Sequence, residues 1–129
     1  MIGVILLTVP SIQYGGYFLL TILSGKAKLS LTDFQKSMFR AGHAHAGVLV
    51  ILAIIAQLLA DQCSFGPMTE WIVRIGFPLA AILVSGGFFA SAAGKNRTTP
   101  NSMVTVLYSG VFVLAACLVI LGIGLLTSE

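Results

Sequence analysis

Four long apolar runs constrain what this chain can fold into more than any other feature of its sequence. The runs cover residues 2–23, 38–60, 71–94 and 103–127. Each reaches the roughly 20 residues that a helix needs to cross a bilayer, and none alternates with the period of two that is typical of strands. Because backbone polar groups in lipid must find partners within the protein, the runs predict four transmembrane helices.

The composition agrees with a protein surrounded by membrane lipid. Hydrophobic residues make up 57% of the 129 and charged residues 9%, whereas a soluble domain carries roughly 25% charged residues. No linker or repeat divides the chain, so we expect one all-α domain over residues 1–129, an integral membrane four-helix bundle. The first run is too long for the core of a signal peptide and no lysine or arginine precedes it, so no signal peptide is expected.

The charges in the three connections predict the orientation. Lysine and arginine gather in the first and third connections (Lys26, Lys28, Lys36, Lys95 and Arg97), whereas the second carries Asp61 and Glu70. Since cytoplasmic loops are enriched in lysine and arginine, both termini of this multi-pass protein should face outward. The net charge of +3 then reflects topology, and no nucleic-acid partner is expected.

Both histidines of the chain lie at the start of the second run, at positions 43 and 45. Ionisable groups inside a bilayer are costly and usually mark a site, and imidazole is a common ligand of iron, copper and zinc. The alternative is that one histidine reaches the headgroups and the other bonds a neighbouring helix. Two residues apart on a helix means about 200° around its axis, so a single metal can take only one of them. Gly47, on the stripe of His43, would leave room beside a planar ligand.

The polar side chains of the spans are expected in their cytoplasmic halves. At about 1.5 Å per residue they fall roughly 7–14 Å from the cytoplasmic ends, while the outer half is almost purely aliphatic. Such a layer suggests a cavity or cofactor site; the alternative is an interfacial tyrosine belt with serines and a glutamine bonding neighbouring helices. Its members are Tyr14, Tyr17, His43, His45, Ser85, Tyr108 and Ser109, with Gln13 near mid-membrane.

The small and sulfur-containing residues predict packing. Cys63 and Cys117 should lie about 10 Å apart in depth and remain unpaired, with Cys117 a packing residue. These cysteines and the two histidines do not converge on a zinc site. Gly86, Ala90 and Gly94, spaced by four, would let the third helix approach a neighbour closely, within the bundle or across a subunit boundary.

Three short segments carry a resemblance to a known family. They are Arg40-Ala41 with His45-Ala46-Gly47, then Gly87-Phe88-Phe89-Ala90-Ser91, and finally Pro100-Asn101. In order and spacing they resemble styrene oxide isomerase, a small four-helix bacterial membrane protein. That family has Arg-Ala-His-Ser-Gly at the mouth of helix two, Gly-Phe-Tyr-Phe-Phe-Ser at the end of helix three, and Pro-Asn before helix four. The resemblance covers helices two to four.

The resemblance implies a cofactor and a reaction. The family binds haem b between the subunits of a trimer, and its ferric iron acts as a Lewis acid that turns an epoxide into an aldehyde. It implies that His45 is the axial iron ligand and that His43 is a haem-edge or propionate partner in a homo-oligomer. The matching segments place Arg40, Gly47, Phe88 and Asn101 around the haem, and the substrate would be a small apolar epoxide.

Two departures from the family concern the activity, an intramolecular oxidoreductase reaction. The family's helix-three tyrosine aligns with Phe88 and its helix-two asparagine with Ile51, so haem binding transfers better than isomerase activity. Tyr108 or Tyr17 would have to supply the missing phenol.

Two other functions stay open. One is a haem protein for redox or gas sensing, since the histidines on opposite helix faces can each serve a different haem. The other is a haem-free accessory subunit of a membrane complex.

The predicted orientation can be tested by labelling. In a variant whose Cys63 is replaced by serine, a membrane-impermeant thiol reagent added outside should modify Gln62→Cys and spare Asn96→Cys. The reason is that the second connection should face outward and the third the cytoplasm. Labelling in permeabilised cells controls for reactivity at both positions, and the reverse pattern in intact cells would show an inverted protein.

Overall fold

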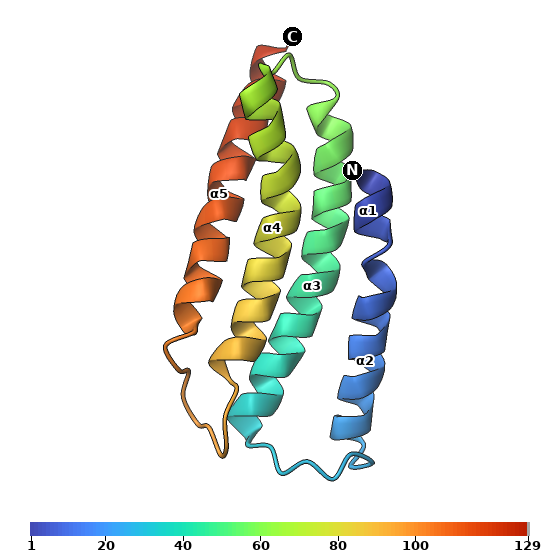
Figure 1. The fold of residues 1–129 in the computed structure, drawn as a ribbon, viewed down its shortest axis with the longest axis vertical. Helices are drawn as coiled ribbons and strands as arrows, with labels where there is room; N and C mark the ends of the chain where they lie inside the picture. Colours follow the sequence, from blue (N-terminus) through green and yellow to red (C-terminus); the bar gives the residue numbers. More distant parts are fainter. Residues whose placement is uncertain (129) are drawn as a thin grey trace.

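The computed structural model describes residues 1–128. Within them the chain forms five helices and no strand: α1 (Ile2–Leu6), α2 (Val9–Leu23), α3 (Asp33–Ala60), α4 (Pro67–Ser91) and α5 (Val104–Thr127). Helices α1 and α2 follow one another along one path, and this pair, α3, α4 and α5 are each long and apolar enough to cross a membrane (Figure 1). The predicted all-α transmembrane fold is confirmed.

The spans stand side by side rather than closing into a ring. Helix α4 packs most extensively, against α3 on one side and α5 on the other, while α1 and α2 pack against α3 (Figure 1). The outermost helices keep wide apolar faces uncovered: Phe112 of α5 is 75% exposed and Leu20 of α2 is 62% exposed. Lipid or another protein surface must cover these faces, because apolar patches of this extent mark interaction sites.

Proline breaks the first span. We expected one helix over residues 2–23, and the structure divides it at Leu7 and Thr8, just before Pro10. Proline has no N–H to donate to the carbonyl four residues earlier, and its ring clashes with that carbonyl, so it suits the first turn of a new helix. The Thr8 hydroxyl donates to the Ile5 carbonyl at 2.6 Å and so satisfies one acceptor at the break.

Side chains of the first connection set the bounds of two helices. Helix α3 begins at Asp33, five residues before the predicted start, because Thr32 and Gln35 form a capping box. The buried Gln35 amide also donates to the carbonyls of Ala92 and Gly94, at 3.0 and 2.8 Å. Helix α4 therefore ends at Ser91 and not at residue 94, where we expected its end. Its start also differs from the prediction: it begins at Pro67 rather than at residue 71, because proline suits the first helical position.

Glycines bring α4 and α5 into backbone contact. A Cβ built on Gly87 would lie 2.5 Å from the Leu107 nitrogen, and one built on Gly110 would lie 2.7 Å from the Val84 nitrogen. The expected stripe is wrong for this contact, since a Cβ on Gly86 would meet nothing within 4 Å and Gly94 lies in the loop at φ 127°. Within the chain it is Gly87, the next residue around the helix, that faces α5, and contact of the stripe across a subunit boundary stays a prediction.

The two cysteines are free, as predicted. Cys117 is buried and Cys63 is half-buried. Cys117 packs in the core between α3, α4 and α5, together with Ala56, Phe77 and Leu121. It acts there as a small apolar residue.

A second proline, Pro78, lies inside α4 without breaking it. Pro78 cannot donate to the carbonyl of Arg74, four residues earlier, which would leave that carbonyl unpaired in the membrane. The Gln57 amide of α3 donates to this carbonyl at 2.9 Å, and Gln57 is only 1% exposed. A side chain of the neighbouring helix thus replaces the missing backbone bond.

Replacing Gln57 by leucine should therefore lower the free energy of unfolding by about 1–3 kcal/mol, because the Arg74 carbonyl would lose its donor. In a Pro78→Ala background the backbone N–H of residue 78 returns, and the same Gln57→Leu change should cost clearly less. Reversible unfolding in mixed detergent micelles would measure all four proteins of this double-mutant cycle. Equal costs in both backgrounds would show that Gln57 does not act through the freed carbonyl.

Candidate functional site

His45 of α3 presents one ring nitrogen for ligation. Its Nδ1 lies 2.8 Å from the carbonyl oxygen of Ala41, one turn earlier in the helix, and the side chain is on the exposed surface. A carbonyl only accepts hydrogen bonds, so Nδ1 carries the proton and donates it. In the neutral ring, the lone pair is then on Nε2. A backbone carbonyl that fixes the ring in this way is the usual outer partner of a metal-bound histidine.

Helix α4 supplies an aromatic neighbour for His45. The rings of His45 and Phe88 lie 4.8 Å apart between centroids and are tilted by 32°. Gly42 allows this approach of α3 to α4, since a Cβ there would lie 3.0 Å from Phe88 Cβ and from Phe89 Cε2. Phe88 therefore contacts the His45 ring directly.

His43 faces a different neighbour. Its half-buried ring packs on α2, where a Cβ built on Gly16 would lie 3.1 Å from His43 Nε2 and one built on Gly15 would lie 3.5 Å from Nδ1. The two glycines make the space that the imidazole fills. The structure thus places the two histidines on different sides of α3, as the spacing of about 200° predicts.

The other predicted site residues are dispersed. Arg40 is exposed and makes no ion pair with any of residues 1–128, and a Cβ on Gly47 would meet nothing within 4 Å. Tyr17 and Tyr108 are 63% and 64% exposed on α2 and α5. In the described part of the chain, no hydrogen bond or ring contact joins either phenol to His45. Both lie on the uncovered outer helices.

Asn101 has a structural role in the loop between α4 and α5. Its amide nitrogen donates to the carbonyls of Ala90 and Ala93, at 2.9 and 3.2 Å, and its oxygen accepts from the backbone N–H of Met103 at 2.8 Å. These bonds satisfy the open end of α4 and set the entry into α5. The amide is fully engaged in holding the loop.

The donor set suits a group that needs one axial ligand. Residues 1–128 bring together no three side chains of the His, Cys, Asp or Glu type that would hold a bare metal ion. A haem iron needs only one imidazole, an apolar slot and cations for its propionates. His45 offers the imidazole beside Phe88, but because His45 is exposed, a haem bound there would need a second surface to complete the slot.

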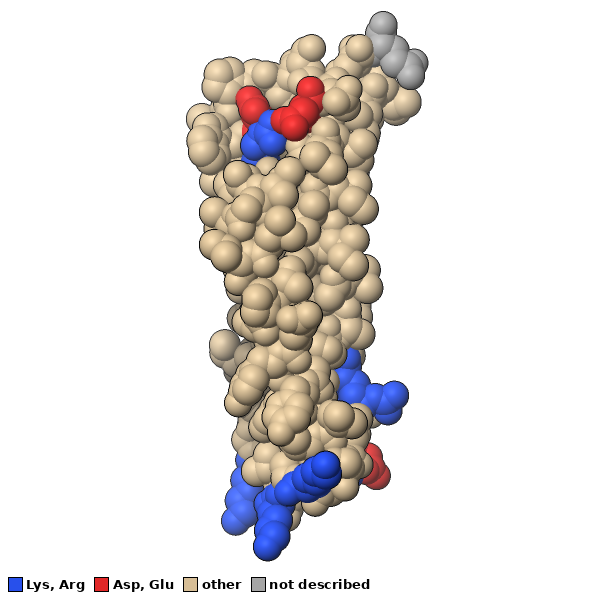
Figure 2. Space-filling model, turned by 90° about the vertical axis from the view of Figure 1, so that its right-hand side faces the viewer, with Lys and Arg blue, Asp and Glu red and all other residues tan. Residues whose placement is uncertain are grey.

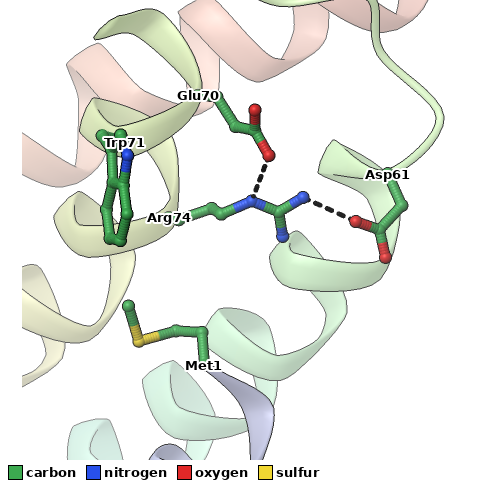
Figure 3. A pocket seen from close by; sticks show the side chains of 5 residues that line it. All are labelled: Met1, Asp61, Glu70, Trp71 and Arg74. Atoms are coloured by element: carbon green, nitrogen blue, oxygen red, sulfur yellow. Dashed lines mark hydrogen bonds and ion pairs between the residues drawn. The ribbon is translucent and has the colours of Figure 1, made fainter. Parts of the chain in front are cut away.

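The end of the spans at the α3–α4 connection holds a charged cluster that was not predicted. Arg74 of α4 donates to Glu70 at 2.9 Å and to Asp61 at 2.5 Å, and these residues line a hollow of about 410 Å³ together with Met1 and Trp71 (Figure 3). Figure 2 shows the mixed charges at this end and mainly lysine and arginine at the other. With Gln57 also buried below the cluster, the expectation of an almost purely aliphatic outer half is wrong.

This cluster follows from residues that are visible in the sequence. Gln57 and Asp61 are four apart on α3, and Glu70 and Arg74 are four apart on α4, which places each pair on one helix face. The Arg74 Nη1 also donates to the Gln57 carbonyl at 3.3 Å. The cluster therefore ties α3 to α4 and gives the half-buried Arg74 two anionic partners.

Comparison with protein-family models, with curated proteins and with solved structures finds no match to this chain.

Proposed function

We propose that this chain is a haem b-binding membrane protein with His45 as the axial iron ligand, functionally similar to styrene oxide isomerase. One observation carries the proposal: Nδ1 of His45 donates to Ala41, which leaves the Nε2 lone pair free on an exposed face. A free histidine nitrogen in an apolar span is otherwise costly, and a metal ligand bond would satisfy it.

The residues around His45 have separable tasks. The Ala41 carbonyl orients the imidazole, and Phe88 forms an apolar wall 4.8 Å from it. Arg40, one turn and a half nearer the end of the span, is an exposed cation that suits a propionate. Gly47 leaves open space on the same helix. Since a single chain leaves His45 uncovered, the slot is proposed to close between copies in a homo-oligomer, and a trimer is what the family resemblance implies.

Bound ferric haem would supply Lewis acidity toward the oxygen of a small epoxide, which is the basis of the proposed isomerisation to an aldehyde. The chain itself would position the substrate poorly. Phe88 lies where a phenol is expected and cannot donate a hydrogen bond, and Ile51 is an exposed aliphatic residue. We therefore propose weak isomerase activity rather than an efficient enzyme.

The packing of His43 argues against a second haem on this chain. Its ring fills the space left by Gly15 and Gly16, so a second ligand bond would require α2 to move. Binding of one haem at His45 is therefore favoured over electron transfer between two haems. The proposed location is a bacterial inner membrane, with both termini outside.

Haem binding should depend on His45 far more than on His43. Protein purified from haem-replete cells should show a Soret band; His45→Ala should remove it, and His43→Ala should only weaken it because that ring packs on α2. Absorption spectra of the oxidised and reduced proteins measure this, with circular dichroism as the control for folding. Full haem retention by folded His45→Ala, or a colourless wild type, would contradict the proposal and favour a haem-free accessory subunit.

The ferric protein should convert styrene oxide slowly, and Phe88→Tyr should raise the rate. A positioned donor for the opening epoxide oxygen is worth on the order of 100- to 1,000-fold. Aldehyde formation would be followed in ferric and dithionite-reduced protein. Phe89→Tyr is the matched control, since Phe89 faces Phe39, at 5.5 Å between ring centroids, rather than His45. If neither wild type nor Phe88→Tyr forms aldehyde while haem is bound, the sensing or redox function is favoured.

A further inference from the structure

A second cavity lies between the first span and the α3–α4 pair. Its volume is about 270 Å³, and α1, α2, α3 and α4 all contribute to its walls. Small residues line the α3 and α4 walls, among them Ala46, Ala53 and Ala81, which is why the space stays unfilled. His45 is not part of the lining, so this cavity is separate from the proposed haem site.

Ser85 places an unsatisfied hydroxyl at this cavity. It lines the cavity, is only 7% exposed, and has the one buried side-chain nitrogen or oxygen within residues 1–128 that lacks a hydrogen-bond partner. Other helical serines bond their own backbone: Ser91 Oγ donates to the Phe88 carbonyl at 3.1 Å and Ser109 Oγ to the Val106 carbonyl at 2.8 Å. Burying a hydroxyl in an apolar wall without this bond costs free energy of folding, unless another group accepts its hydrogen bond.

The surrounding groups do not provide the missing partner. Two more hydroxyls line the cavity, but Thr8 and Ser11 donate to the carbonyls of Ile5 and Thr8, each at 2.6 Å. Among the side-chain hydroxyls of these walls, Ser85 is therefore the one whose proton has no acceptor. A lipid acyl chain would fill the space but has no acceptor.

We propose that this cavity binds a small, mostly apolar molecule that carries one oxygen acceptor, such as a ketone or an ether, and that Ser85 donates the hydrogen bond to that oxygen. The size is appropriate, because an engineered apolar cavity of about 150 Å³ already holds benzene. Ser85 lies six residues from the end of α4, or about 9 Å into the span, so such a molecule would enter from the bilayer. The inference stands on the cavity and Ser85 and does not require haem.

The carbonyl stretch of ¹³C-labelled acetophenone tests the inference, since hydrogen bonding lowers its frequency. Infrared difference spectra of the full-length protein against empty micelles should show a bound, low-frequency band. The band should persist in Ser109→Ala, whose hydroxyl lies outside the cavity, and disappear in Ser85→Ala. α-Methylstyrene, which has the same shape without the oxygen, should compete for the cavity about 3- to 10-fold less well than unlabelled acetophenone.

Two further variants keep the outcome decisive. Ala46→Leu should reduce the band by filling the cavity from α3, which decides the question even if Ser85→Ala folds poorly. His45→Ala should keep the band, so loss of haem and loss of this site are distinguished. A missing band in the wild type, its retention in Ser85→Ala, or its loss in His45→Ala would overturn the proposal.

Discussion

The need to pair every backbone group inside a membrane governs this fold, and its two span prolines show how. At Pro10, no side chain within residues 1–128 donates to the carbonyl of Leu6, four residues earlier, and the first span breaks into α1 and α2. Pro78 removes the same bond from α4, but the buried Gln57 of α3 donates to the freed Arg74 carbonyl and α4 continues. The same residue type therefore accompanies a break in one span and is accommodated in another, because only at Pro78 does a neighbouring helix donate to the freed carbonyl.

Glycines then decide which polar groups remain available. Gly15 and Gly16 give His43 a place against α2, whereas Gly42 brings α4 close enough to put Phe88 beside His45. One imidazole is used for packing and the other keeps a free nitrogen on the surface. In a membrane, where lipid is as apolar as leucine, close backbone approach at small residues replaces the hydrophobic effect as the source of helix association.

Predictions that depend on the geometry of one short segment agree with the structure better than those that depend on contacts between distant segments. The angular relation of His43 and His45 follows from helix geometry alone, and the structure agrees with it. The capping box of Thr32 and Gln35 also depends only on neighbouring residues. It makes α3 begin five residues before the predicted start. The engagement of Asn101 with Ala90 and Ala93, by contrast, depends on how the loop returns, which no periodicity encodes.

Hydropathy, length and the 3.6-residue turn are properties of short segments, so the sequence was sufficient to predict the number of spans, the all-helical class and the opposite directions of the two histidines. The packing of the helices, in contrast, sets which glycine faces α5, Gly87 rather than Gly86. It also brings the Gln57 amide to the Arg74 carbonyl that Pro78 leaves without a donor. It also decided that the Ser85 hydroxyl remains without a partner beside a cavity. Each of these depends on the rotation and offset of one helix against another, and those are set by the packing of side chains distant in sequence.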